Sequence, residues 1–95
     1  MFLILVNYKK SLEIVDQYLA EHRKYLAEGY KKNYYVVSGT RSPRTGGIIL
    51  SQLKDRKQLE DIIQQDPFYL QHIADFEIIE FNPALYHDNF ASFIQ

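Results

Sequence analysis

The sequence contains no cysteine and no tryptophan among its 95 residues. Without cysteine the chain can form neither a disulfide nor a thiolate zinc site, and it has no cysteine nucleophile. A domain this short hides only roughly 65% of the surface of its unfolded chain, so a single copy is marginally stable. Small domains of marginal stability often add disulfides, a metal or a partner subunit, and this chain cannot form a disulfide.

The sequence also lacks a strong net charge and a long apolar run. Eleven basic and twelve acidic residues give a net charge of −1. Because nucleic-acid binding depends on neutralising phosphates, no general nucleic-acid role is expected. The apolar run at the N-terminus, Phe2 to Val6, is far shorter than the ~20 residues of a membrane span, and no positive charge precedes it. We therefore expect a cytoplasmic protein that binds neither nucleic acid nor membranes.

The residues that are present predict strands and helices in the order βαββαβ. Runs of β-branched and aromatic residues indicate the strands, and Ser11 and Asp55 are good N-terminal caps for two helices. Gly29 is expected to end the first helix, and Pro67 interrupts the second. We expect one domain over residues 1–95. The predicted strands are 2–8, 34–37, 48–53 and 74–81, and the predicted helices are 11–28, 55–65 and a short C-terminal helix or extension over 84–95.

This order is the signature of a ferredoxin-like α+β sandwich, in which both helices cover one face of a four-stranded antiparallel sheet. Strands covered on one face should alternate apolar and polar residues. The strands at 2–8, 34–37 and 48–50 instead carry apolar side chains on both faces. We therefore predict a homodimer in which the uncovered sheet faces of two copies pack together. The alternative is a monomer with an exposed aromatic face.

Each of the two main helices has an apolar stripe with one polar member. The first stripe contains His22, and the second ends at Asp66. We expect the two helices to run parallel, and both residues lie eleven positions beyond their caps, so they should reach a similar height. An aspartate beside a histidine fixes which ring nitrogen carries the proton, which suits a general base. The pair would also be a sound structural ion pair, so the geometry favours the functional interpretation without settling it.

The loop between the middle strands, residues 38–47, holds three glycines, four hydroxyl side chains and two arginines. Its backbone N–H groups, with Arg41 or Arg44, could hold an anionic substrate. For Arg44 to Gly47 we prefer an ordinary hairpin connection. Ser38 and Gly39 close a strand and are therefore candidates for a cavity wall.

Two residues near His22 on the first helix are further candidates for substrate binding. Tyr25 lies three positions after His22 and could reach the same pocket, and Arg23 could place a guanidinium at the pocket rim. Alternatively, Tyr25 is a packing residue and Arg23 is a solvent-exposed residue of the helix. His72 and His87 lack a second ligand at metal spacing, so we expect no metal site.

Five short motifs occur in order: His22-Arg-x-Tyr-Leu, Ser38-Gly, Pro43-Arg-x-Gly-Gly, Asp66-Pro-Phe and Glu80-Phe-x-Pro. This series covers nearly the whole chain and resembles the YciI-like (YCII-related domain) family. The resemblance implies a ferredoxin-like fold that pairs as a dimeric α/β barrel. It also implies an active site around a histidine and an aspartate, here His22 and Asp66, with Ser38 and Gly39 in the pocket wall. One branch of the family resembles a dehydrochlorinase that acts on a chlorinated hydroxyquinol.

The function we expect is that of a small enzyme of the lyase or isomerase kind that uses no metal or organic cofactor. His22 would move a proton on a small cyclic or aromatic substrate, and Asp66 would orient the imidazole. A non-catalytic module that binds or senses a small molecule in the same pocket is the alternative. A third possibility makes the His–Asp pair purely structural, so the sequence leaves open whether the chain is an enzyme.

Overall fold

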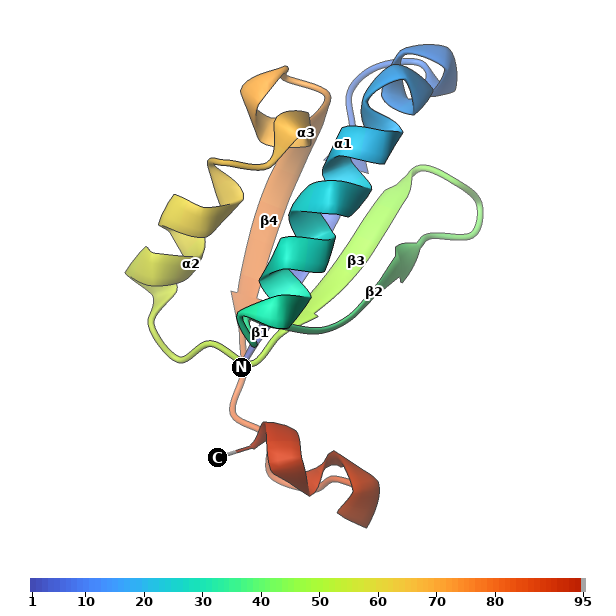
Figure 1. Ribbon diagram of the computed structural model, residues 1–95. Helices are drawn as coiled ribbons and strands as arrows, with labels where there is room; N and C mark the ends of the chain where they lie inside the picture. The colour runs from blue at the N-terminus through green and yellow to red at the C-terminus, as the bar shows by residue number, and fades with distance from the viewer. Residues whose placement is uncertain (95) are drawn as a thin grey trace.

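The computed structural model describes residues 1–94. Its elements follow the predicted order, and a short helix that begins at Pro67 follows the second main helix (Figure 1). The strands are β1 (Phe2–Tyr8), β2 (Tyr35–Thr40), β3 (Gly46–Ser51) and β4 (Ala74–Glu80), and the helices are α1 (Leu12–Lys31), α2 (Arg56–Ile63), α3 (Pro67–Leu70) and the 3₁₀ helix η1 (Asp88–Phe93).

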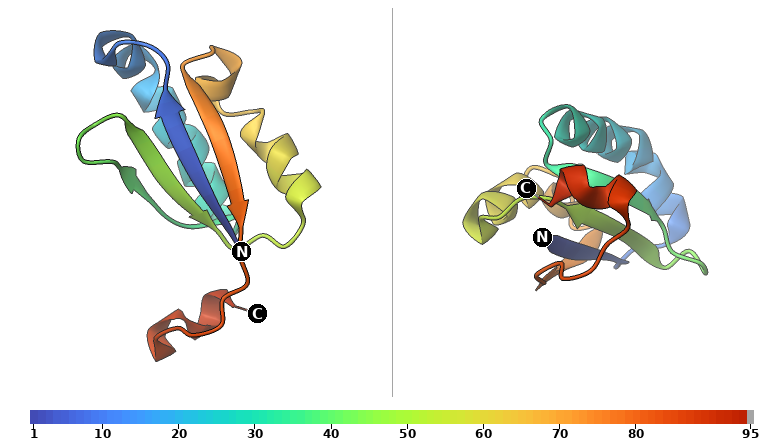
Figure 2. Two further views of the ribbon diagram at one scale, coloured as in Figure 1. Left: turned by 180° about the vertical axis from the view of Figure 1, so that it is seen from behind. Right: turned by 90° about the horizontal axis from the view of Figure 1, so that it is seen from below.

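The four strands form one sheet in the order β2-β3-β1-β4, and every pair of neighbours is antiparallel. The helices α1, α2 and α3 cover one face of this sheet, while no helix within residues 1–94 covers the other face (Figures 1 and 2). The predicted ferredoxin-like α+β fold is therefore confirmed.

Helix α1 begins as predicted but continues beyond its predicted end. The Ser11 side chain accepts a hydrogen bond from the Ile14 N–H, which caps the first turn. The prediction that Gly29 ends the helix is wrong, because the helix runs on to Lys31 and turns at Asn33, whose φ is 60°. Gly29 serves packing instead, since a Cβ at this position would lie 2.5 Å from two carbons of the Tyr35 ring.

The second helical segment is divided in two at the predicted place. Asp55 caps α2 by accepting from the Lys57 N–H at 3.0 Å. Asp66 then caps α3 by accepting from the Phe68 N–H at 2.9 Å, and Pro67 occupies the first helical position. This second cap fixes the backbone at Asp66, whose side chain contacts His22 of α1.

The prediction that α1 and α2 run parallel is wrong. Each helix runs antiparallel to the strand before it, and because β1 and β3 are themselves antiparallel, the two helices point in opposite directions (Figure 1). His22 lies near the midpoint of α1, and α2 is short enough to end at that height. The two residues therefore meet, although the reasoning from parallel helices does not explain why.

The hydrophobic core lies between the helices and the sheet. Every second residue of β1 faces this core, so Phe2, Ile4 and Val6 are almost fully buried. The opposite sheet face is also apolar, as predicted, and in the single chain it is open to solvent. Glu77, opposite Leu5, is a charged residue on this face, and its apolar side chains include Leu3, Leu5, Val37, Ile48, Leu50 and Ile79, of which Val37 is 56% exposed. The predicted pairing of two such faces stays a prediction.

The chain beyond β4 extends away from the sheet (Figures 1 and 2). The predicted C-terminal helix is present as η1, in which the Phe90 and Phe93 rings lie 5.3 Å apart. Leu85 precedes this helix and is 96% exposed. Gln95, the last residue of the predicted extension, lies outside the described residues. Within residues 1–94, no helix has both the length and the apolar character that a membrane span requires.

Candidate functional site

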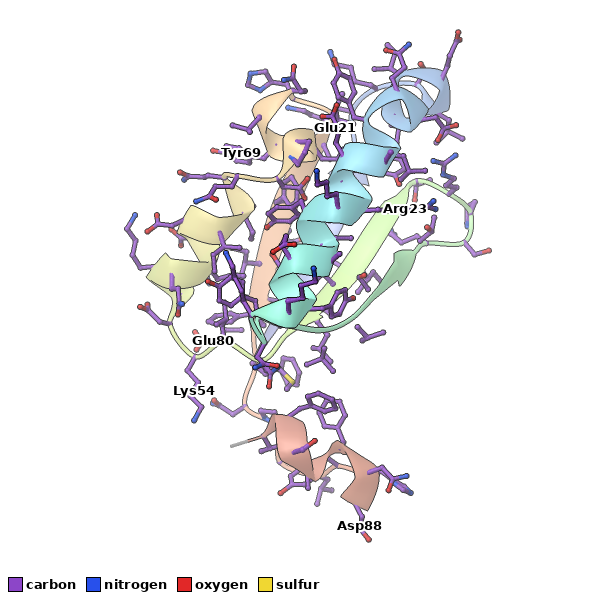
Figure 3. The ribbon with its side chains drawn as sticks, in the orientation of Figure 1. Glu21, Arg23, Lys54, Tyr69, Glu80 and Asp88 are labelled. Carbon is purple, nitrogen blue, oxygen red and sulfur yellow. The ribbon has the colours of Figure 1, made fainter. Side chains whose placement is uncertain are left out.

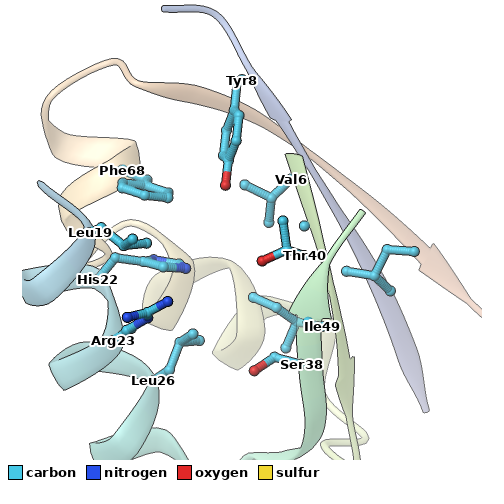
Figure 4. A pocket seen from close by; sticks show the side chains of 13 residues that line it. Val6, Tyr8, Leu19, His22, Arg23, Leu26, Ser38, Thr40, Ile49 and Phe68 are labelled. Carbon is cyan, nitrogen blue, oxygen red and sulfur yellow. The ribbon is translucent and has the colours of Figure 1, made fainter. Parts of the chain in front are cut away.

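A pocket of about 240 Å³ opens between α1 and the sheet strands β1, β2 and β3 (Figure 4). One wall comes from α1, the opposite wall from the ends of β2 and β3, and Phe68 of α3 closes one side. The lining residues are Val6, Tyr8, Leu19, His22, Arg23, Leu26, Ser38, Gly39, Thr40, Gly47, Ile48, Ile49 and Phe68. Four of the seven residues predicted for the site therefore line one cavity.

His22, which lines the pocket, forms a hydrogen bond with Asp66, which lies behind it. The His22 Nδ1 lies 2.9 Å from the Asp66 Oδ1. His22 is 9% exposed, and Asp66 has no exposed surface. An ionised carboxylate can only accept, so Nδ1 carries the proton and Nε2 keeps its lone pair. The imidazole points into the pocket (Figure 4), and its free nitrogen is therefore available to a ligand.

The same Asp66 oxygen has a second donor. The Oδ1 atom also accepts from the Phe68 N–H at 2.9 Å, so one oxygen ties α1 to the start of α3. The other oxygen, Oδ2, is buried and has no hydrogen-bond partner among residues 1–94. The Phe68 ring lies flat on the His22 imidazole, with centroids 4.0 Å apart and an angle of 4° between the planes. These contacts leave the imidazole a single orientation.

Ser38, Gly39 and Arg23 lie where the sequence predicted, on the pocket wall. The Tyr30 hydroxyl donates to the Ser38 Oγ at 2.6 Å, which leaves the serine proton free for a ligand. Arg23 reaches from α1 toward the β3 side of the molecule (Figures 3 and 4). Of the thirteen described residues that line the pocket, Arg23 is the one lysine, arginine, aspartate or glutamate.

Tyr25 and Arg41, also predicted to bind substrate, lie outside this pocket lining. The Tyr25 hydroxyl donates to the Ile62 carbonyl at 3.0 Å and lies 2.7 Å from the Tyr35 hydroxyl, so it turns toward α2. Burial, together with the nearby Tyr35, raises the pKa of Tyr25 well above its usual value. Arg41 donates to the Asn7 Oδ1 at 2.6 Å. Both residues therefore serve packing and loop anchoring in this chain.

Tyr8 lines the pocket although the sequence reasoning did not select it. It is the next core-facing residue after Val6 in the alternation along β1, and this alternation was the available signal. Arg44, assigned to an ordinary hairpin connection, instead forms an ion pair with Asp16 of α1. That hydrogen bond with Arg44 lowers the pKa of Asp16. The loop after β2 is thus fastened to the helix beside Tyr8.

Metal-binding side chains do not gather in the part of the chain that the structure describes. No group of three or more histidine, aspartate or glutamate residues within residues 1–94 has an arrangement that could hold a metal ion. The polar groups of the pocket are instead one imidazole, one guanidinium and three hydroxyls, from His22, Arg23, Tyr8, Ser38 and Thr40. This set suits hydrogen bonding and proton transfer.

Comparison with known structures and families finds a similar fold and a matching family. The fold is similar to that of 5-chloro-2-hydroxyhydroquinone dehydrochlorinase (TftG) from Burkholderia phenoliruptrix AC1100, in its complex with 2,5-dihydroxybenzoquinone. The TM-score is 0.70 at 16% sequence identity, over 85% of this chain and 93% of that chain. None of the curated proteins matches the sequence. The sequence profile of the YCII-related domain matches residues 1–82, and the chain therefore belongs to the YCII-related domain family.

Proposed function

We propose that this protein is a small enzyme of the lyase or isomerase type that transfers a proton without a cofactor. In this proposal His22 takes a proton from, and returns one to, a small cyclic or aromatic substrate, while Asp66 orients the imidazole. The observation that carries the proposal is the orientation of His22, whose Nδ1 is held by the buried Asp66 while its ring faces the pocket.

The pair has the properties that proton transfer requires. Asp66 keeps the proton on Nδ1, so Nε2 is the nitrogen that faces the substrate. When Nε2 takes a proton, the imidazole becomes positively charged, and the adjacent carboxylate stabilises that charge. Stacking on Phe68 prevents the ring from turning away. A positioned general base of this kind typically accelerates a reaction about 10²–10⁴-fold.

The size and surroundings of the pocket support a small ring-shaped substrate. Its volume of about 240 Å³ is just below the range of about 300–1,000 Å³ found for pockets that hold drug-sized ligands. Apolar side chains, among them Val6, Leu19, Leu26 and Ile49, suit the faces of a ring. The dehydrochlorinase of the same fold was crystallised with 2,5-dihydroxybenzoquinone, a compound of this size and shape.

Deuterium exchange into candidate substrates tests the proposal without requiring the complete reaction. Wild-type protein is incubated in D₂O with cyclic ketones and hydroxylated quinones, including 2,5-dihydroxybenzoquinone, and loss of the C–H signal is followed by proton NMR. We expect exchange with the wild type and a loss of about 10²–10⁴-fold in His22→Gln. The matched control is His72→Gln, since His72 is exposed and lies outside the pocket lining.

Two other outcomes would replace the proposal. If native mass spectrometry shows a retained ligand while neither protein exchanges any substrate, the pocket belongs to a binding or sensing module. If His22→Leu raises the melting temperature and leaves ligand binding intact, the His–Asp pair is structural. Unchanged exchange in His22→Gln would refute the role of His22 as the base.

A further inference from the structure

The Tyr8 hydroxyl lies in the same pocket as His22, and the proposed function does not use it. The Tyr8 ring packs edge-on against Phe68, with centroids 5.9 Å apart and an angle of 89° between the planes. Because Phe68 also lies flat on His22, one phenyl ring positions both side chains. The Tyr8 hydroxyl points into the space in front of the imidazole (Figure 4).

The Ser38 hydroxyl of this pocket receives a protein donor and keeps its own proton for a ligand. Tyr30 donates to the Ser38 Oγ at 2.6 Å. A hydroxyl that accepts from one side becomes a stronger donor on the other.

The lining of the pocket is rich in donors, and none of the lining residues within the described part of the chain carries a carboxylate. Arg23 adds a positive charge to the Tyr8 and Ser38 hydroxyls, while Asp66 is fully buried behind His22. Such a lining is complementary to an oxygen atom that carries or develops negative charge. The Nε2 atom of His22 is the base that faces these donors across the pocket.

We infer that Tyr8 is a second catalytic residue, whose hydroxyl donates to the substrate oxygen that becomes negative while His22 removes a proton from a neighbouring carbon. This inference rests on the proposed function and names its substrate class, which is a small cyclic compound with an acidic C–H group beside a carbonyl.

The proton-transfer step balances with these groups alone. The C–H bond breaks and its proton passes to the Nε2 of His22. The electron pair forms a carbon–carbon double bond, and the π electrons of the carbonyl move onto its oxygen. Tyr8 stabilises the resulting enolate through its hydrogen bond. The enolate then either takes the proton back at another carbon, which gives an isomer, or re-forms the carbonyl and expels an anionic leaving group from the β-carbon.

Binding of 4-nitrophenol tests the donor role of Tyr8 separately from turnover. The ionised form of this ring compound carries an oxyanion and differs from the neutral form in visible absorption. We expect wild-type protein to bind the ionised form in preference to 4-nitroanisole, a matched ring without an ionisable oxygen. Hydrogen bonds to charged groups are worth about 1.5–3 kcal/mol, so Tyr8→Phe should weaken binding of the ionised probe about 10–100-fold. Its affinity for 4-nitroanisole should not change.

Further variants make each outcome decisive. Tyr69→Phe is the matched control, because Tyr69 is partly exposed on α3 and does not line the pocket. If Tyr8→Phe fails to fold, Tyr8→Leu decides the question, because it also removes the hydroxyl and should likewise weaken binding of the ionised probe.

The inference is overturned if the ionised probe does not bind the wild type, or if Tyr8→Phe binds it as tightly. Where a substrate exchanges deuterium, Tyr8→Phe should lower kcat about 10²–10³-fold with little change in KM. His22→Gln distinguishes this inference from the proposed function, since it should lose exchange and still bind the probe. If the wild type binds the probe through Tyr8 but exchanges no substrate, the proposed function fails and Tyr8 is a ligand-binding residue rather than a catalytic one.

Discussion

Replacing Asp66 by asparagine or by alanine separates the hydrogen bonds of this residue from its charge. Both donors that reach the side chain, the His22 Nδ1 and the Phe68 N–H, bind the same oxygen, Oδ1. The second oxygen has no partner among residues 1–94. An asparagine can therefore keep both hydrogen bonds on its carbonyl oxygen and place its NH₂ group where Oδ2 was. Alanine loses both.

The two variants should differ clearly in stability. Asp66→Ala removes the N-terminal cap of α3, which is worth about 1 kcal/mol, and leaves a buried N–H of His22 unpaired, which costs about 1–3 kcal/mol. The free energy of unfolding should therefore fall by about 2–4 kcal/mol. For a domain of this size that corresponds to a melting temperature lower by roughly 8 °C or more. Asp66→Asn should lose about 1–2 kcal/mol, because both hydrogen bonds on the carbonyl oxygen remain while its buried NH₂ group takes the place of an oxygen that has no partner among residues 1–94.

The activities of the two Asp66 variants should not follow their difference in stability. Asparagine cannot stabilise a positively charged imidazole, so Asp66→Asn should lose about 10²–10⁴-fold in deuterium exchange although it is more stable than Asp66→Ala. Stability is measured by urea unfolding followed by far-UV circular dichroism, at one fixed chain concentration so that association does not shift the midpoint. The reasoning fails if Asp66→Asn is as unstable as Asp66→Ala, or if it exchanges substrate at the wild-type rate.

Three further predictions follow from the open sheet face, the tight packing at one glycine and the buried tyrosines. Light scattering should show a dimer for the wild type and a folded monomer for Val37→Lys, because Val37 lies exposed on the apolar face of the sheet. A wild-type monomer at micromolar concentration would contradict the prediction that the apolar sheet faces of two copies pack together. Gly29→Ala should lower the free energy of unfolding by about 1–3 kcal/mol, since its Cβ would lie 2.5 Å from the Tyr35 ring. The control Gly39→Ala, whose Cβ would have no atom within 4 Å, should change the free energy of unfolding by less than about 0.5 kcal/mol. Equal urea midpoints for the two variants would argue against this packing. Burial raises the pKa of Tyr35 to about 12. Because unfolded tyrosine ionises near pH 10, this contribution to stability is complete below pH ~10 and is lost as the pH rises toward 12. Urea unfolding of Tyr35→Phe should accordingly depend less on pH in that range than unfolding of the wild type.

Local chemistry explains how much of the fold was predictable. The caps at Ser11, Asp55 and Asp66 each act on backbone groups within three residues, so the starts of the helices follow from short segments of sequence. The end of α1 was not predictable in this way. Gly29 continues the helix because the Tyr35 ring packs where its side chain would be, and that contact exists only once β2 lies beside α1.

The candidate site was predictable where one chain segment determines the direction of a side chain. The apolar stripe of α1 places His22 toward the core, and the strand end at Ser38 and Gly39 places both beside the cavity. Tyr25 lies on the same helix as His22, but its hydroxyl turns to Tyr35 and the Ile62 carbonyl. Spacing along a helix predicts which face a residue occupies, and it does not predict the hydrogen-bond partner that its terminal atoms select.

The sequence by itself determined the element order, the ferredoxin-like fold, the two apolar faces of the sheet and the candidate residues His22 and Asp66. All of these follow from periodicity, capping and motif order. Only the tertiary structure decided that the helices are antiparallel, that Asp66 binds Nδ1 with one oxygen, and that Arg44 reaches Asp16. These contacts join residues 28 to 44 positions apart, so they depend on how strands and helices pack together rather than on the composition of any one segment.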